Sequence, residues 1–226
     1  MTLLGKPLLA HTAEAALASV RLTRIVLSTD DPAIAECGRS LGLEVPFLRP
    51  RELAQDDTPT IPVLQHVVRR LEAAGASYDA VFVLQPTNPL RTTADIDGAI
   101  ELLETSGADS VISCVDVGDH HPARMKQVNA AGQVSNPPFA ELFEGQPRQC
   151  LPKMFLREGS VYLARMRVLM DRNSLQGADC RAWIIPRERG WNIDTPFDLF
   201  IVEQMMRARS MPGPSGAPHQ EAAHAR

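Results

Sequence analysis

The chain has 226 residues, of which 44% are hydrophobic, and its formal net charge is −4 at pH 7. This length can bury a complete core, so we expect one α/β domain with a smaller appendage. The acidic balance argues against a nucleic-acid-binding surface. No apolar run approaches the roughly 20 residues of a spanning helix, which argues against a membrane protein.

The four cysteines are far apart in the chain and form no CxxC pair. They therefore indicate neither a zinc site nor a disulfide framework. The N-terminus also lacks the charged-then-apolar pattern of a secretion signal. Together these features predict a reduced, cytoplasmic protein.

Strand and helix patterns alternate up to Val115. A helix is predicted from Pro7 onward with no strand before it, and Asp30 or Asp31 is predicted to cap the next helix. The other predicted elements are strands at 24–28, 44–48 and 109–115 and helices at 33–41, 63–74 and 93–106. Such alternation predicts a three-layer α/β sandwich with a mostly parallel sheet.

The segment at 78–91 is the one around which we expect the site to form. Residues 81–84 form an apolar run without alternation, typical of a buried central strand. Four polar residues follow the run: Gln85, Thr87, Asn88 and Arg91. Ligands of open α/β sheets bind at the carboxyl ends of strands. A turn that is merely stiffened by Pro86 and Pro89 is the alternative interpretation.

The alternation stops between Asp116 and Phe155. This stretch is rich in proline and carries three basic residues, Arg124, Lys126 and Arg148. A structureless loop of this length is unusual in a compact domain, so we expect a β-rich arm over the site or against a partner subunit. The basic residues either form a solvated surface or clamp a carboxylate or phosphate.

Strand patterns return at 158–164 and 183–186, before a last helix that reaches about Arg207. Asp194 lies at the turn before this helix. Either Asp194 or Thr195 caps the helix, or Asp194 binds Mg²⁺ with Asn192 as a further oxygen donor. We expect a domain at 1–209, with the arm inserted at 116–155, and a disordered tail at 210–226.

Eight segments follow one another in the order and spacing of a known family. They are Gly5–Ala10, Ser28–Asp30, Val45–Pro50, Leu84–Arg91, Gly107–Val111, Arg148–Pro152, Glu158–Tyr162 and Asn192–Thr195. In these segments the chain resembles the acylneuraminate cytidylyltransferases, which are the synthetases of CMP-sialic acid and their relatives for legionaminic and pseudaminic acids. The resemblance covers nearly the whole chain up to its tail.

The resemblance implies transfer of CMP from CTP to the anomeric hydroxyl of an acidic nine-carbon sugar, with Mg²⁺ as cofactor and pyrophosphate as the second product. It also implies a homodimer whose arm completes the partner's pocket. The implied sugar-binding residues are Gln85, Arg124, Arg148, Glu158 and Tyr162. The implied nucleotide-binding residues are Thr60, Ser28 and Asp30. The implied metal ligands are Asp194 and Asn192, and the implied catalytic residues are Asp194, Gln85 and Arg148.

Three features depart from the family pattern. Family members begin with a strand and a glycine-rich loop that cradles the CTP phosphates, and this sequence starts after that loop. We therefore expect either a start upstream or a truncated, inactive copy. Asn192 stands where many relatives have aspartate. Glu158 stands where sialic acid enzymes often have asparagine, and no Phe-Phe pair lies near Ser174, which argues against N-acetylneuraminate as the sugar.

Two alternatives to this function remain open at the level of sequence. One is another sugar nucleotidyltransferase, acting on an eight-carbon keto-acid sugar. The other is a catalytically inactive sugar-binding or regulatory subunit, because backbone amides of the glycine-rich loop are the main phosphate cradle.

Overall fold

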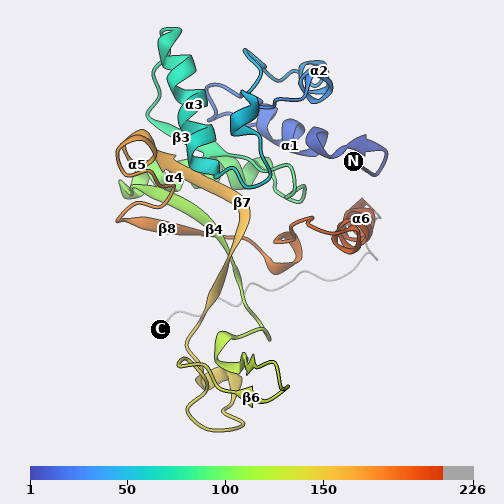
Figure 1. Ribbon diagram of the computed structural model, residues 1–226, viewed down its shortest axis with the longest axis vertical. Coiled ribbons are helices and arrows are strands. Elements are labelled where there is room, and N and C mark those ends of the chain that lie inside the picture. Colours follow the sequence, from blue (N-terminus) through green and yellow to red (C-terminus); the bar gives the residue numbers. More distant parts are fainter. Residues whose placement is uncertain (211–226) are drawn as a thin grey trace, which may run out of the picture.

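The computed structural model describes residues 1–210. The disordered tail was predicted at 210–226; Ser210 instead ends the last helix, and the rest of that prediction lies outside the described residues. The described chain forms an α/β body from which a narrow arm projects (Figure 1). The body is built on a four-stranded sheet with the order β3, β7, β4, β8. These strands are β3 (Ala80–Val83), β4 (Ser110–Asp116), β7 (Phe155–Arg165) and β8 (Cys180–Ile184).

The sheet is mixed, so the expectation of a mostly parallel sheet was wrong. β4 and β8 pair in parallel, whereas β7 runs antiparallel to both of its neighbours, β3 and β4. A strand that is buried on both faces has the same apolar pattern in either direction, so the pattern could not indicate the direction of β7. β3, expected as a central strand, lies at one edge of this sheet, and its residues are half-buried.

The strands predicted at 24–28 and 44–48 are reduced to a single parallel bridge between Val26 and Glu44. Two backbone hydrogen bonds support this bridge: the N–H of Leu27 donates to the carbonyl oxygen of Glu44, and the N–H of Glu44 donates to that of Ile25. Pro46 cannot donate a hydrogen bond, which limits how far the pairing extends.

A small hairpin precedes the first helix, contrary to the prediction. It pairs β1 (Thr2–Leu3) with β2 (Lys6–Pro7). Leu4 and Gly5 between them have φ angles of 51° and 78°. Positive φ at both central residues is typical of the tight turns that connect short hairpins. Strands of this length are too short for periodicity to reveal them.

Five of the helices in the described residues lie close to predicted positions, and one further helix, at 166–171, was not predicted. They are α1 (Leu8–Leu17), α2 (Pro32–Ser40), α3 (Thr60–Ala73), α4 (Thr93–Ser106), α5 (Met166–Asp171) and α6 (Pro196–Ser210). The carboxylate of Asp31 caps α2, as one of the two predicted alternatives, and the side chain of Thr92 caps α4. Every helix within residues 1–210 is too short or too polar to cross a membrane.

Two apolar clusters hold the body together. In the first, α4 packs against the sheet through Ala99, Leu103, Val111, Val161 and Leu163. In the second, Leu3, Leu90, Ile193 and Val202 join the hairpin, the loop after β3 and α6. The second cluster therefore anchors two segments that were predicted to carry the site, at 84–91 and at 192–195.

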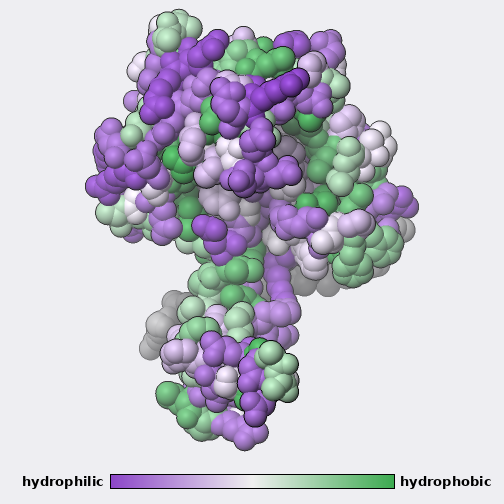
Figure 2. All heavy atoms as spheres, in the orientation of Figure 1, coloured by the Kyte–Doolittle hydropathy of each residue, from purple (hydrophilic) through white to green (hydrophobic). Residues whose placement is uncertain are grey.

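The arm comprises residues 117–154, between the end of β4 and the start of β7 (Figure 1). It contains the 3-10 turns η2 (Pro122–Arg124) and η3 (Arg148–Cys150) and the short strands β5 (Gln127–Val128) and β6 (Val134–Ser135). Its strand content is thus lower than that of the predicted β-rich arm. Hydrophobic residues are visible at its base and along its outer end (Figure 2).

Candidate functional site

The loop after β3 folds back on itself. The backbone N–H of Asn88 donates to the carbonyl oxygen of Gln85 at 3.3 Å, and the N–H of Arg91 donates to that of Asn88 at 3.3 Å. The Nη2 atom of Arg91 also donates to the carbonyl oxygen of Gln85, at 2.6 Å. Two hydrogen bonds therefore converge on one backbone oxygen, which fixes the backbone at Gln85.

The polar side chains of this loop differ in accessibility, although we expected all of them at the crevice. Asn88 is 1% exposed and Arg91 is 5% exposed, so both lie in the interior. Gln85 and Thr87 are half-buried. Within the described residues, Nε and Nη1 of Arg91 and Oδ1 of Asn88 have no hydrogen-bond partner. The loop thus leaves Gln85 and Thr87 partly accessible above a buried cation.

A bulge in β7, at residues 158–161, faces this loop. β4 has one residue, Ser113, opposite these residues. The hydroxyl of Ser113 accepts the N–H of Val161 at 2.7 Å and donates to the carbonyl oxygen of Glu158 at 3.3 Å. Bulges are common next to active sites, where they redirect a side chain. This bulge directs the carboxylate of Glu158 towards Asn88.

Glu158 lies in the interior, where it is 8% exposed. Its Oε1 accepts the N–H of Ser160 at 2.9 Å, and its Oε2 accepts the Ser160 hydroxyl at 2.9 Å and Nδ2 of Asn88 at 3.3 Å. Burial lowers the pKa of Arg91 to about 10, while the charges of Glu158 and Asp95 oppose this shift. Glu158 is therefore part of a buried polar network with the loop.

Gly159 allows the bulge and the loop to approach each other. A Cβ atom at this position would lie 2.4 Å from Oδ1 of Asn88 and 2.8 Å from Oε1 of Gln85. Both distances are below van der Waals contact, so any larger residue would displace these side chains. The carboxamide of Gln85 consequently lies directly against the backbone of β7.

The segment before α6 is docked onto the same loop. The N–H of Ile193 donates to the carbonyl oxygen of Thr87 at 2.9 Å, and the Ile193 side chain is 4% exposed. Its neighbours are Asn192, whose Oδ1 is buried without a hydrogen-bond partner among the described residues, and Asp194, which is exposed. The structure therefore brings Gln85 and the predicted metal ligands into one region.

Thr195, not Asp194, caps α6. The Thr195 hydroxyl accepts the N–H of Asp198 at 3.2 Å, and the Asp198 carboxylate accepts the N–H of Thr195 at 2.8 Å. The pKa of Asp198 is lowered because its carboxylate accepts hydrogen bonds from the Thr195 hydroxyl and from the backbone N–H groups of Thr195 and Asp194. The carboxylate of Asp194 accepts no hydrogen bond from a described residue, so it is free of the alternative capping role.

Asp95 links the start of α4 to the turn η4 (Arg187–Arg189). Its carboxylate is paired with Arg189 and accepts Nε1 of Trp183 at 3.2 Å. Burial alone would raise the pKa of Asp95, but hydrogen bonds from Arg189, Thr92 and Trp183 lower it overall. This ion pair joins α4 to η4, and the charge of Asp95 also acts on the buried Arg91, as the charge of Glu158 does.

The predicted nucleotide-binding residues lie apart from the Gln85 loop in sequence: Ser28 and Asp30 follow the bridge at Val26, and Thr60 begins α3. Asp30 and Thr60 are exposed, and the Ser28 hydroxyl is buried without a described partner. The sequence reasoning missed Arg49 in this part. Its Nη2 donates to the carbonyl oxygen of Ser28 at 3.1 Å, and its buried Nε has no partner among the described residues. Arg49 directly follows a predicted strand, so the rule applied to Gln85 would have identified it.

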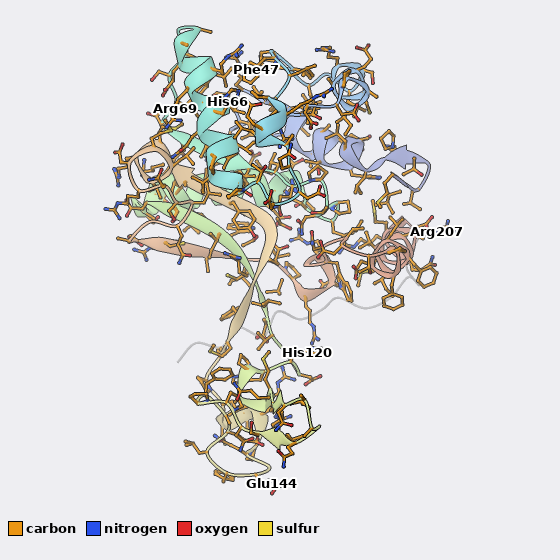
Figure 3. All side chains as sticks on the ribbon, viewed as in Figure 1. Phe47, His66, Arg69, His120, Glu144 and Arg207 are labelled. Carbon is orange, nitrogen blue, oxygen red and sulfur yellow. The ribbon has the colours of Figure 1, made fainter. Side chains whose placement is uncertain are left out.

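The arm does not bring Arg124 and Arg148 to the Gln85 loop of the same chain. The arm extends from the narrow neck, where His120 lies, to its far end at Glu144 (Figure 3). Nη2 of Arg124 donates to the carbonyl oxygen of Gln146 at 3.3 Å, and Arg148 forms an ion pair with Asp119 at 2.6 Å. Arg148 also lines a cavity of about 430 Å³ at the base of the arm.

Tyr162 lies on β7 and pairs with Val83 of β3. The guanidinium carbon of Arg157 lies 5.9 Å from the centre of its ring. At this distance the contact is a weak cation–π interaction. Among residues 1–210, no group of three or more His, Cys, Asp or Glu side chains is placed to hold a metal ion.

The described residues form an α/β protein with a mixed sheet, and two solved structures share this fold. The structure is similar to that of CMP:2-keto-3-deoxy-manno-octonic acid synthetase complexed with CTP, with a TM-score of 0.67 and 17% identity over 92% of this chain and 91% of the other. It is also similar to 4-diphosphocytidyl-2C-methyl-D-erythritol synthase, with a TM-score of 0.58 and 13% identity over 91% and 93% of the two chains.

The sequence comparisons give the family. The family model described as Cytidylyltransferase matches residues 1–176, and the chain belongs to this family. It is 30% identical over 206 residues to CMP-N,N'-diacetyllegionaminic acid synthase of Legionella pneumophila, covering 90% of this chain and 87% of the relative.

Two further relatives carry related names. The chain is 27% identical to pseudaminic acid cytidylyltransferase of Campylobacter jejuni, covering 87% of this chain and 83% of the relative. It is 25% identical to N-acylneuraminate cytidylyltransferase of Escherichia coli, covering 92% of this chain and 48% of that longer relative. The family predicted from the ordered segments is thus confirmed.

Proposed function

We propose that the protein transfers CMP from CTP to the anomeric hydroxyl of a nonulosonic acid and releases pyrophosphate. The observation that carries the proposal is family membership together with relatives named for legionaminic, pseudaminic and acylneuraminic acids. In this reaction the sugar oxygen attacks the α-phosphorus of CTP. The bond from the α-phosphorus to the oxygen that bridges to the β-phosphorus breaks, and the hydroxyl proton passes to solvent.

Mg²⁺ is the proposed cofactor, with Asp194 and Asn192 as its protein ligands. The donor set fits, because Asp194 offers an exposed carboxylate without a competing hydrogen bond and Asn192 offers an unpartnered oxygen. Mg²⁺ bound with phosphates typically takes one or two protein carboxylates and several waters, so a larger acidic cluster is not needed. When bound, it would neutralise charge on the phosphate oxygens.

The protein side chains contribute mainly by positioning in this proposal. Gln85 binds the sugar from the loop after β3, and Tyr162 lines the sugar pocket beside it. On the nucleotide side, Ser28, Asp30 and Thr60 are joined by Arg49, because its unpartnered guanidinium nitrogen is a ready donor to an anionic or carbonyl oxygen. Catalysis by orientation and electrostatics suits phosphoryl transfer, in which little covalent chemistry falls to the protein.

Arg124 and Arg148 are proposed to act on the pocket of a partner subunit. In one chain they lie on the arm, away from the Gln85 loop (Figure 1). The arm also exposes large hydrophobic residues, which favours burial against a second copy of the chain. These residues are Met125, Val128, Val134, Phe139, Leu142, Phe143 and Met154. A homodimer would bring a carboxylate-binding arginine to each sugar pocket.

The function is tested by measuring pyrophosphate release with CTP, Mg²⁺ and a panel of acidic sugars. We expect turnover with at least one of legionaminic, pseudaminic and N-acetylneuraminic acids, and least with the last. Faster turnover with an eight-carbon keto-acid sugar would favour the other nucleotidyltransferase function. If no sugar reacts and calorimetry detects no binding of CTP with Mg²⁺, the chain is a catalytically inactive member of the family.

A further inference from the structure

The buried network beneath the Gln85 loop has no part in the reaction as proposed above. It contains a carboxylate, Glu158, and a guanidinium, Arg91, which are 8% and 5% exposed. Burying charged groups is costly unless each is compensated by hydrogen bonds or an opposite charge. If these two positions served packing alone, apolar residues of similar volume would fill them equally well.

Arg91 is poorly compensated for a buried cation. Within residues 1–210, Nη2 is the only guanidinium nitrogen of Arg91 that donates a hydrogen bond, and its acceptor is the carbonyl oxygen of Gln85. The negative charge of Glu158 stabilises the cation across the interior. Among the described residues, the hydrogen bond of the Arg91 side chain is therefore to the backbone of the residue predicted to bind the sugar.

Glu158 reaches the same residue by a second route. Its carboxylate accepts Nδ2 of Asn88, and the backbone N–H of Asn88 donates to the carbonyl oxygen of Gln85. Glu158 also accepts two hydrogen bonds from Ser160, which hold its carboxylate within the bulge. Its acceptor sites are thus directed into the protein and engaged there.

We propose that Glu158 and Arg91 are positioning residues that act through Gln85. Arg91 donates directly to the Gln85 carbonyl oxygen, and Glu158 holds Asn88, whose backbone N–H donates to the same oxygen. Together they set the place of the Gln85 carboxamide against Gly159. Glu158 itself does not contact the sugar. This inference rests on the proposed function where it is tested by enzyme kinetics. A second test, by amide hydrogen exchange of the loop, depends only on the structure.

The kinetic test compares Gln85→Ala, Glu158→Gln and the double variant. Each single change should raise KM for the sugar about tenfold or more, because a small misplacement of a binding group is enough for such a loss. KM for CTP should stay close to that of the unchanged protein. The double variant should be no worse than Gln85→Ala alone, because Glu158 acts only through Gln85. If the increase in sugar KM in the double variant equalled the product of the two single increases, the proposal would be overturned, since Glu158 would then contact the sugar itself.

The second test follows amide hydrogen exchange in the unliganded chain. Glu158→Gln should speed exchange at residues 85–91 by about fivefold or more, because the loop loses one of its two supports. Exchange in α1 and α3 should not change. The matched control is Glu72→Gln, which alters an exposed carboxylate on α3 and should leave the loop as it is. Unchanged exchange at 85–91 in Glu158→Gln would overturn the proposal.

The two tests separate failure of the inference from failure of the function. If the unchanged protein releases pyrophosphate with a panel sugar but the double variant shows multiplied effects, the function holds and the positioning role is refuted. If no sugar reacts while Glu158→Gln still loosens residues 85–91, the function is refuted and the positioning role in the folded chain holds.

Discussion

At the scale of single residues, Gly159 has restricted surroundings next to Gln85. The side-chain oxygens of Asn88 and Gln85 occupy the space that a Cβ atom would need. Such a position depends on the absence of a side chain rather than on the flexibility of glycine. A change here tests the predicted role of Gln85 without altering any polar group.

We expect Gly159→Ala to raise KM for the sugar about tenfold or more, because Gln85 must move. Overpacking should also lower the free energy of unfolding by roughly 1–3 kcal/mol. Steady-state kinetics and urea unfolding give the two values. The control is Gly38→Ala on α2, where the added Cβ would meet only Cδ2 of the Leu27 side chain at under 3 Å. A normal sugar KM in Gly159→Ala would contradict the role of Gln85.

Asp194 and Asp198 form a matched pair four residues apart. We expect Asp194→Asn to reduce kcat by about 100-fold without changing the unfolding temperature, because its carboxylate supports only the proposed metal. Asp198→Asn should instead lower the unfolding temperature and spare kcat, because a neutral amide oxygen replaces the charged acceptor and weakens the capping box of α6. Pyrophosphate assays and thermal melts measure both. Equal losses of stability in the two variants would show that Asp194 is structural.

Asp95 gives a prediction for pH. Its pKa lies below the ordinary value of 3.8 in the folded protein, so its stabilising effect is present above about pH 4 and is lost as the pH falls further. Asp95→Asn should therefore lower the free energy of unfolding by roughly 3 kcal/mol at pH 7, because Arg189 is left unpaired, and by clearly less at pH 3. Urea midpoints at the two pH values measure this. A difference that does not shrink in acid would mean that the Asp95 charge is not what stabilises the fold.

At the scale of elements, the bulge in β7 decides where the polar groups go. The hydroxyl of Ser113 satisfies the N–H of Val161, which the irregular pairing would otherwise leave without a partner. We expect Ser113→Ala to lower the free energy of unfolding by about 1–3 kcal/mol, since a buried donor is then unsatisfied. Ser174→Ala, in an exposed turn, is the comparison. Urea unfolding that did not distinguish the two variants would show that the bulge does not need this hydroxyl.

Sequence reasoning located most elements but not their contacts. Local rules suffice for α1, for the Asp31 cap and for Thr195 as one of two candidate caps, because these depend on neighbours in the chain. The direction of β7 and the burial of Arg91 depend on residues more than 60 positions away, such as Glu158. The spacing of the loop gave no sign that Asn88 and Arg91 face inward, because a polar residue after a strand is typical of both situations.

At the scale of the whole molecule, the arm separates two sets of predicted site residues. Gln85, Asn192 and Asp194 belong to the body, whereas Arg124 and Arg148 belong to the arm. If partner subunits complete each other's sites, a mixture of Gln85→Ala and Arg148→Ala chains should regain activity, because some pockets then contain neither change. Mixing at several ratios and measuring pyrophosphate release would test this. No recovery after subunit exchange would place both residues in one chain's site.

The hydrophobic surface of the arm makes a related prediction about assembly. Leu142→Glu should convert a dimer to a monomer, because Leu142 is 89% exposed in the single chain and a charge there would have to be buried at the interface. Light scattering after gel filtration measures the mass. Val20→Glu, at a position 88% exposed on the body, is the matched control and should keep the dimer. A monomeric unchanged protein would contradict the proposed assembly.

The two ends of the arm leave the sheet as paired neighbours, since Asp116 lies opposite Phe155. The arm therefore leaves and rejoins the sheet at one pair of neighbouring residues, and a tight turn is enough to connect them directly. With Asn-Gly in place of residues 117–154, β4 and β7 would become an ordinary antiparallel hairpin. The geometry of the chain thus permits a body without the arm, whose pyrophosphate release can be compared with that of the complete chain.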